Sequence, residues 1–367
     1  MLPDFSTPLF HDGIYKRCLR LNWLFILMIM LWAAIGIALL YSAAGGDFNP
    51  WAMRQLIYLG IGFCIMIGLA LTNPQFWMNY AYVIYGGALL LLVAVELVGA
   101  TGMGAQRWLD LKFFRLQPSE LMKAAMVLAL ARYFHGLDIE DTGKIKSLII
   151  PFLLLSLPVL LVLRQPDLGT AILIVIGGLM VMFLAGIRLW KFVVMGASAV
   201  AAVPLAWNFI LHDYQKRRIL IFLEPERDPL GAGYHITQSK IALGSGGMFG
   251  RGYMNGPQSQ NSFLPEKHTD FIFTMLGEEM GLRGTFGLLI LFCGLLAVGA
   301  VLSLRASSQF NRLVGFGMIN NFALYVIINI AMVTGLAPVV GVPLPLISYG
   351  GSATISVMAG FGLVLMV

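Results

Sequence analysis

A short polar run, Pro265 to Phe271, stands directly before a long apolar segment. It carries four ionisable side chains, those of Glu266, Lys267, His268 and Asp270, together with the small polar Thr269. An ionisable group at the edge of a membrane segment marks a functional site by default. The alternative is that Asp270 only begins a helix, where exposed amide groups favour a carboxylate. The other polar segments of the chain bear on the choice.

Two of these segments, at 104–109 and 117–123, bracket the start of an apolar stretch. With the residues between them they supply candidate substrate-binding side chains: Arg107, Trp108, Lys112, Gln117, Glu120 and Lys123. Arg107 and Trp108 suit an interfacial anchor, or else a cation cluster for an anionic ligand. Glu120 and Lys123 are three residues apart, so they share a helix face and can form an ion pair instead.

Four further candidates lie in three other segments: Asp167, Arg217, Arg218 and Ser348. Asp167 lies in a polar turn, where a helix cap explains it as well as a ligand does. The run at 216–218 has the usual alternative of a solvated charge cluster. Ser348 belongs to an irregular stretch, 341–352, that membrane depth tolerates only if it is buried in protein or lines a cavity. A glycine-rich stretch, 243–252, matches neither a dinucleotide fingerprint nor a P-loop.

Composition fixes the class of protein that must position these residues. Hydrophobic residues make up 59% of the chain, charged residues 11%, and the mean hydropathy is +0.83. The apolar runs are long and unbroken, which excludes a barrel of short alternating strands. The three cysteines suggest neither a disulfide framework nor a metal site, and the net charge of +6 does not indicate nucleic-acid binding. We expect an all-α, polytopic membrane protein.

The apolar runs predict about ten transmembrane helices. They lie at roughly 21–43, 54–73, 76–98, 118–136, 146–164, 168–187, 190–211, 284–304, 313–335 and 350–367. No cleavable signal is evident before the first run. Lysine and arginine are more frequent in the segments that are inside if the N-terminus is cytoplasmic, so we expect both termini on the cytoplasmic side.

We expect the whole chain, 1–367, to form a single domain. Two regions depart from the alternation of apolar spans and short loops. The outside loop at about 212–269 is long, and its aromatic residues predict order. The run at 270–304 has no proline and would exceed 50 Å as one helix, against a bilayer core of about 30 Å. We therefore expect a separate interfacial or cavity-lining helix at about 270–283. The residues indicate an outward polar cavity open to lipid, suited to an anionic amphiphile such as a lipid-linked phosphate.

Five motifs in order along nearly the whole chain resemble the SEDS family (shape, elongation, division and sporulation). They are His268–Phe271, Gly104–Leu109, Gln117–Glu120, Arg164–Gly169 and Pro343–Gly351. The stretch Pro338–Pro345 is similar to the elongation members rather than the division members.

The resemblance implies a peptidoglycan glycosyltransferase that polymerises lipid II at the outer face of the bacterial inner membrane during elongation. It implies a class B penicillin-binding protein and other elongation-machinery proteins as partners, with membrane lipid and no nucleic acid. Asp270 would be the general base, and the cations above would hold the pyrophosphate. His268 would position substrate or, with Asp270, a divalent metal such as Mg²⁺ or Mn²⁺; no organic cofactor is implied. The alternatives are a lipid II flippase and a non-enzymatic scaffold for the transpeptidase.

Overall fold

The computed structural model describes residues 18–19, 21–102, 105–110, 115–209, 213–224, 231–260 and 266–367. The helices are α2 (Trp23–Ala43), α3 (Trp51–Ala70), α4 (Pro74–Val98), α5 (Pro118–His135), α6 (Ile139–Thr142), α7 (Ile145–Arg164), α8 (Leu168–Leu184), α9 (Leu189–Phe209), α10 (Asp213–Leu223), α11 (Ala232–Gly246), α12 (Pro257–Gln260), α13 (Ile272–Arg305), α14 (Gln309–Val333) and α15 (Gly351–Met366). The strands are β1 (Ala100–Gly102), β2 (Ala105–Asp110) and β3 (Arg115–Leu116).

The expected polytopic helical fold is confirmed. Each predicted span has a helix within a few residues of its expected ends. In the part of the chain that the structure describes, six helices are long and apolar enough to cross a membrane, namely α2, α3, α4, α7, α13 and α14. The helices α8 and α15 and the stretch Leu189–Pro204 of α9 are apolar but shorter. Helix α5 is the polar member, since it carries Glu120, Lys123 and Arg132.

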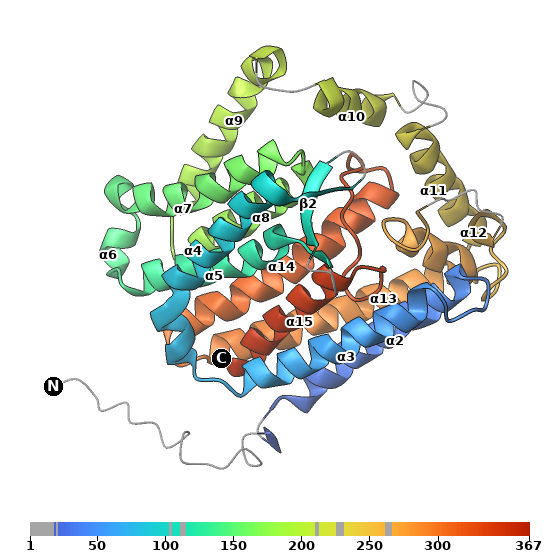
Figure 1. Ribbon diagram of the computed structural model, residues 1–367, viewed down its shortest axis with the longest axis horizontal. Helices are drawn as coiled ribbons and strands as arrows, with labels where there is room; N and C mark the ends of the chain where they lie inside the picture. Colours follow the sequence, from blue (N-terminus) through green and yellow to red (C-terminus); the bar gives the residue numbers. More distant parts are fainter. Residues whose placement is uncertain are drawn as a thin grey trace.

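Most of the helices form one bundle, while α9 and α10 stand apart from it (Figure 1). Helix α15 lies along α3, α4 along α5, and α13 between α2 and α14. At the centre, the buried Trp32 ring contacts Phe292 and Phe322, and Phe322 contacts Phe361. This aromatic core joins α2, α13, α14 and α15, so the helices next to the site share one packed interior.

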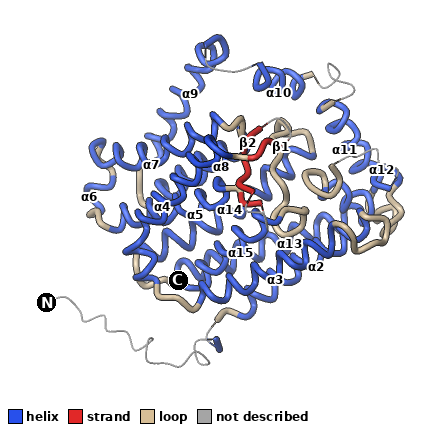
Figure 2. The backbone as a smooth tube through the Cα atoms, viewed as in Figure 1, coloured by secondary structure: helices blue, strands red, loops and turns tan. Residues whose placement is uncertain are grey.

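The sequence did not reveal a small antiparallel sheet of order β1-β2-β3. Ala100 pairs with Trp108, and Leu109 pairs with Leu116. The strands contact α4, α5 and α15, and Figure 2 shows them with several loops beside the helices of the bundle. The sheet therefore holds the segment of Arg107 and Trp108 in place as it leads into α5.

Helix α13 is broken at Gly281, which has φ +64° and ψ −158°. The residues from Phe271 to Glu279 are all buried, so this first half lies inside the protein rather than at its surface. Its two acids are tied to neighbouring elements. Glu278 accepts hydrogen bonds from the backbone N–H groups of Gln258 (2.7 Å) and Ser259 (3.0 Å), and Glu279 accepts one from the Ser42 hydroxyl (2.5 Å).

A glycine-rich loop, 246–252, supplies the hydrogen bonds that the broken helix loses. Arg251 N donates to Glu278 O (2.9 Å) and Gly252 N to Glu279 O (3.0 Å), while Leu282 N donates to Gly247 O (2.9 Å). We call this contact the glycine clasp. It satisfies backbone groups that would otherwise be unpaired inside the protein. The long predicted loop thus contains α10, α11, the clasp and α12.

A candidate active site around Asp270

The segment before α13 is fixed by the irregular stretch between α14 and α15. The Ser348 hydroxyl donates to Thr269 O (2.6 Å) and accepts from Leu344 N (2.8 Å), while Tyr349 N donates to His268 O (2.9 Å). Ser348 is 2% exposed, and its hydroxyl is occupied in both directions. These two hydrogen bonds give Ser348 a positioning role. A substrate contact of Ser348 stays a prediction.

Asp270 is half-buried at the start of α13. The Asn329 side chain on α14 donates to Asp270 O (2.9 Å) and to Val342 O (2.8 Å). Gly341 has φ +73°, and a Cβ atom there would lie 3.7 Å from Asp270 Oδ2. The Asp270 carboxylate thus lies beside the Gly341 backbone, and the Asn329 amide ties the Asp270 carbonyl to the 341–349 stretch through Val342.

His268 forms one wall of the same site. Its ring stacks on Trp51 at 4.3 Å between centroids and an interplanar angle of 14°, and Tyr349 lies 6.3 Å away. Burial lowers the pKa of the His268 imidazole, so the ring is neutral at neutral pH. Its Nδ1 is buried without a hydrogen-bond partner. A neutral ring of this kind can accept a hydrogen bond from a ligand.

Three predicted residues meet at the start of α8. Arg107 Nε lies 3.9 Å from Asp167 Oδ2 and donates to Gln165 O (3.3 Å), and its Nη2 donates to Pro166 O. Gln117 Nε2 donates to Asp167 Oδ2 (3.3 Å). Asp167 also caps α8 through Thr170 N (3.2 Å). Asp167 is therefore a helix cap that also pairs with the half-buried Arg107. A substrate contact of Asp167 stays a prediction.

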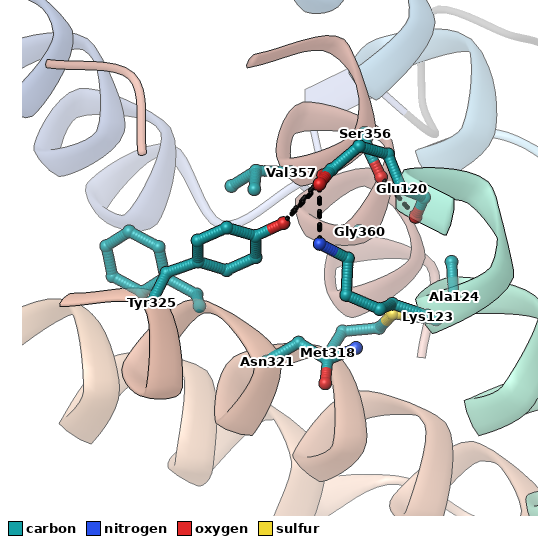
Figure 3. A pocket seen from close by; sticks show the side chains of 10 residues that line it. Glu120, Lys123, Ala124, Met318, Asn321, Tyr325, Ser356, Val357 and Gly360 are labelled. Carbon is teal, nitrogen blue, oxygen red and sulfur yellow. Dashed lines mark hydrogen bonds and ion pairs between the residues drawn. The ribbon is translucent and has the colours of Figure 1, made fainter. Parts of the chain in front are cut away.

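Glu120 and Lys123 form a buried ion pair of 2.6 Å. The Tyr325 hydroxyl donates to both Glu120 carboxylate oxygens at 2.7 Å, and Lys123 Nζ lies 4.1 Å from the Tyr325 ring centroid. Figure 3 shows the Lys123 ammonium and the Tyr325 hydroxyl converging on one carboxylate. The adjoining cavity measures about 30 Å³, which is too small for a sugar ring. This geometry favours the ion pair; a substrate contact of either residue stays a prediction.

Four predicted substrate-binding residues remain. Lys112 lies outside the described residues. Arg217 and Arg218 belong to α10, which stands apart from the bundle in Figure 1. Trp108 is half-buried on β2. Their role in binding substrate stays a prediction.

The sequence did not place Tyr325 or Asn329 at the site. The two are four residues apart on α14 and therefore share a face. They lie about 6 Å apart along the helix axis, so α14 connects the Glu120 ion pair to the anchor of Asp270. The signal available in the sequence was this spacing, a tyrosine and an asparagine on one face of an otherwise apolar helix.

We expect Lys123→Met to lower stability strongly, because it leaves the Glu120 carboxylate buried without its cation, a loss of about 3–5 kcal/mol. The double variant Glu120→Gln with Lys123→Met removes both charges and should regain most of that loss. The measurement is the thermal midpoint of the purified protein. A single variant with unchanged midpoint and defective substrate binding would instead assign Lys123 to the substrate.

The fold and the site define a polytopic membrane protein with an anchored carboxylate at one end of its bundle. The chain belongs to the FtsW/RodA/SpoVE cell cycle protein family, which matches residues 22–367. It is 45% identical to peptidoglycan glycosyltransferase MrdB of Escherichia coli K12, covering 94% of this chain and 91% of that one. It is 35% identical to the probable peptidoglycan glycosyltransferase FtsW of Geobacter sulfurreducens, covering 95% of each.

Solved structures agree with this assignment. A chain of a peptidoglycan synthase complex that coordinates polymerization and crosslinking superposes with a TM-score of 0.83 at 34% identity, covering 95% of this chain and 97% of that one. The rod shape determining protein RodA of Thermus thermophilus gives 0.71 at 31% identity, with 95% and 96% covered. The expected family is therefore confirmed.

Proposed function

We propose that this chain is a peptidoglycan glycosyltransferase that polymerises lipid II at the outer face of the inner membrane during elongation. The observation that carries the proposal is the half-buried Asp270, anchored through its backbone by Asn329 and through its neighbours by Ser348 and Tyr349. The names of the relatives in the family support the same reaction.

The reaction joins a sugar hydroxyl to the anomeric carbon of a lipid-linked disaccharide. A new carbon–oxygen bond forms, the bond from that carbon to the pyrophosphate oxygen breaks, and the hydroxyl proton goes to the Asp270 carboxylate. A hydroxyl is a poor nucleophile until a base takes this proton, and such a base contributes about 10²–10⁴-fold. The rigid anchoring of Asp270 keeps the base in reacting geometry, which raises the rate without a further chemical group.

Charge that develops on the pyrophosphate needs a cation or a metal. Among the described residues, no group of three or more His, Cys, Asp or Glu side chains could hold a metal ion. Magnesium is often held by one or two carboxylates together with substrate phosphates. We therefore propose that Mg²⁺ or Mn²⁺ would bind only with substrate present, with Asp270 and the neutral His268 as its protein ligands. Such an ion would neutralise the leaving pyrophosphate.

We propose a class B penicillin-binding protein as partner, acting with other elongation-machinery membrane proteins. The complex that contains a similar chain couples polymerization with crosslinking. The partner's outer domain would contact α10, α11 or α12, and its single span would pack on the C-terminal helices. Because α12 and the glycine clasp both hold the half-helix that follows Asp270, contacts there would order the base.

Partner binding should raise polymerisation by the purified chain. The measurement compares glycan length and rate on lipid II with and without the transpeptidase, together with hydrogen exchange across 231–260. An intact complex with unchanged rate and unchanged protection would contradict the coupling. A chain that binds lipid II and forms no polymer even with its partner would favour the flippase or the scaffold.

We also propose that both termini lie on the cytoplasmic side. This orientation puts Asp270 outside, where the polymer is needed. Cys64 on α3 and Cys293 on α13 are exposed thiols within predicted spans, so a single cysteine introduced near Asn255 is the better probe. Labelling of that cysteine by a membrane-impermeant reagent on intact spheroplasts tests the orientation, and protection there would reverse it.

A further inference from the structure

A cavity of about 270 Å³ lies between the turn that joins α2 to α3 and the segment around α12, and it is lined by Trp51, on which His268 stacks. Its polar lining comes from the Asn49 and Gln260 amides and the Lys267 ammonium, and Trp51 supplies an aromatic wall. None of these residues has a part in the proton transfer at Asp270. The cavity has nearly the size of a small-molecule site, typically about 300–1,000 Å³.

Lys267 is the only cation of this lining as the structure describes it. Its Nζ donates to Ser259 O (2.7 Å), which leaves two N–H donors for another acceptor. No carboxylate of the described residues lies within 4.0 Å of this ammonium. These two remaining donors can bind an oxyanion in the cavity through charge-assisted hydrogen bonds.

The cavity and the base share a wall. Trp51 lines the cavity and stacks on His268, the residue that follows Lys267. Lys267 and Asp270 are three residues apart, so their Cα atoms are at most about 11 Å apart. A disaccharide that carries a peptide is longer than this distance. One substrate molecule can therefore reach both places.

We propose that this cavity binds a carboxylate of the peptide carried by the lipid-linked substrate, with Lys267 as its partner. This inference rests on the proposed function and states which part of the substrate the cavity recognises. A single ammonium matches a singly charged carboxylate, whereas a pyrophosphate carries more charge than one lysine balances. The Asn49 and Gln260 amides can pair with peptide groups, and the Trp51 ring can cover a methyl side chain.

The alternative is that Lys267 only balances the buried Glu279 carboxylate. That role would make Lys267 a stability determinant that does not distinguish one substrate from another. A peptide-carboxylate site predicts discrimination between substrates, and a pyrophosphate site predicts an equal loss on all of them. The same set of measurements distinguishes the three roles of Lys267: partner of a peptide carboxylate, partner of the pyrophosphate, or counter-charge of Glu279.

The test uses the full chain in nanodiscs, with its partner where the partner is required. The substrates are lipid II with free peptide carboxylates and the same lipid with those carboxylates amidated. The variants are Lys267→Met, Lys267→Arg and the control Lys240→Met, which removes an exposed lysine of α11. KM, kcat and the thermal midpoint are measured for each.

We expect Lys267→Met to raise KM about ten- to a hundredfold for the free-carboxylate lipid, since a charged hydrogen bond is lost. The amidated lipid should bind wild type and Lys267→Met alike, Lys267→Arg should retain most of the discrimination, and Lys240→Met should behave as wild type. Equal factors on both lipids, or a loss that follows the thermal midpoint, would overturn the inference. If wild type polymerises neither lipid, the proposed function fails, and lipid binding to wild type and Lys267→Met still decides this site by the same comparison.

Discussion

Asp270→Asn should reduce lipid II polymerisation by about 10²–10⁴-fold or more, because the amide cannot accept the proton of the sugar hydroxyl. The side chain keeps its size, and its backbone carbonyl still accepts from Asn329, so the fold should be unchanged. The measurement is the polymerisation rate of purified protein, with the thermal midpoint beside it. Asp270→Ala should lose activity to a similar extent.

Glu266→Gln is the matched control for this prediction. It removes one carboxylate charge from the same turn, and the amide oxygen can still accept the hydrogen bond from Thr269 that Glu266 receives now (2.8 Å). We expect its rate to stay within a few fold of wild type. Near-normal polymerisation by Asp270→Asn, or an equal loss in both variants, would show that Asp270 is not the base.

The helical part of the fold could be predicted from the sequence, because the thickness of a bilayer sets the length of every apolar run that crosses it. The break in α13 was predicted on the same ground, as a run too long for one span, and it lies at Gly281 instead of near Gly284. The glycine clasp was not predictable, since its hydrogen bonds join residues about thirty positions apart. The sheet of β1 to β3 was missed because its strands are short and lie between two polar motifs.

Part of the candidate site could also be predicted from the sequence. The pair of Glu120 and Lys123 followed from their spacing on one helix face. Tyr325 was missed, because an aromatic residue in an apolar helix is expected to pack in the hydrophobic core. The anchoring of Asp270 by Asn329 spans 59 residues, and only the tertiary structure brings α14 to the start of α13. Trp51 and Lys267 were not assigned to a common cavity for the same reason.

The glycine clasp is the second feature on which function should depend strongly. Gly250 has φ +81°, and a Cβ atom there would lie 2.1 Å from Glu279 O. This backbone conformation is unfavourable for alanine, and the atom it would meet is backbone that carries a clasp hydrogen bond from Gly252. The methyl group can be accommodated only if the loop moves away from the first half of α13.

Gly250→Ala should therefore lower the thermal midpoint and abolish most polymerisation, because the released half-helix begins two residues after Asp270. Gly244→Ala is the control: Gly244 is exposed on α11, has no heavy atom within 4 Å of the added Cβ, and alanine favours a helix there by about 1 kcal/mol. Hydrogen exchange across 272–281 should be faster than in wild type for Gly250→Ala and unchanged for Gly244→Ala. If Gly250→Ala keeps wild-type protection and rate, the clasp does not position the base; if it loses rate with protection intact, the loop acts on the substrate directly instead of through α13.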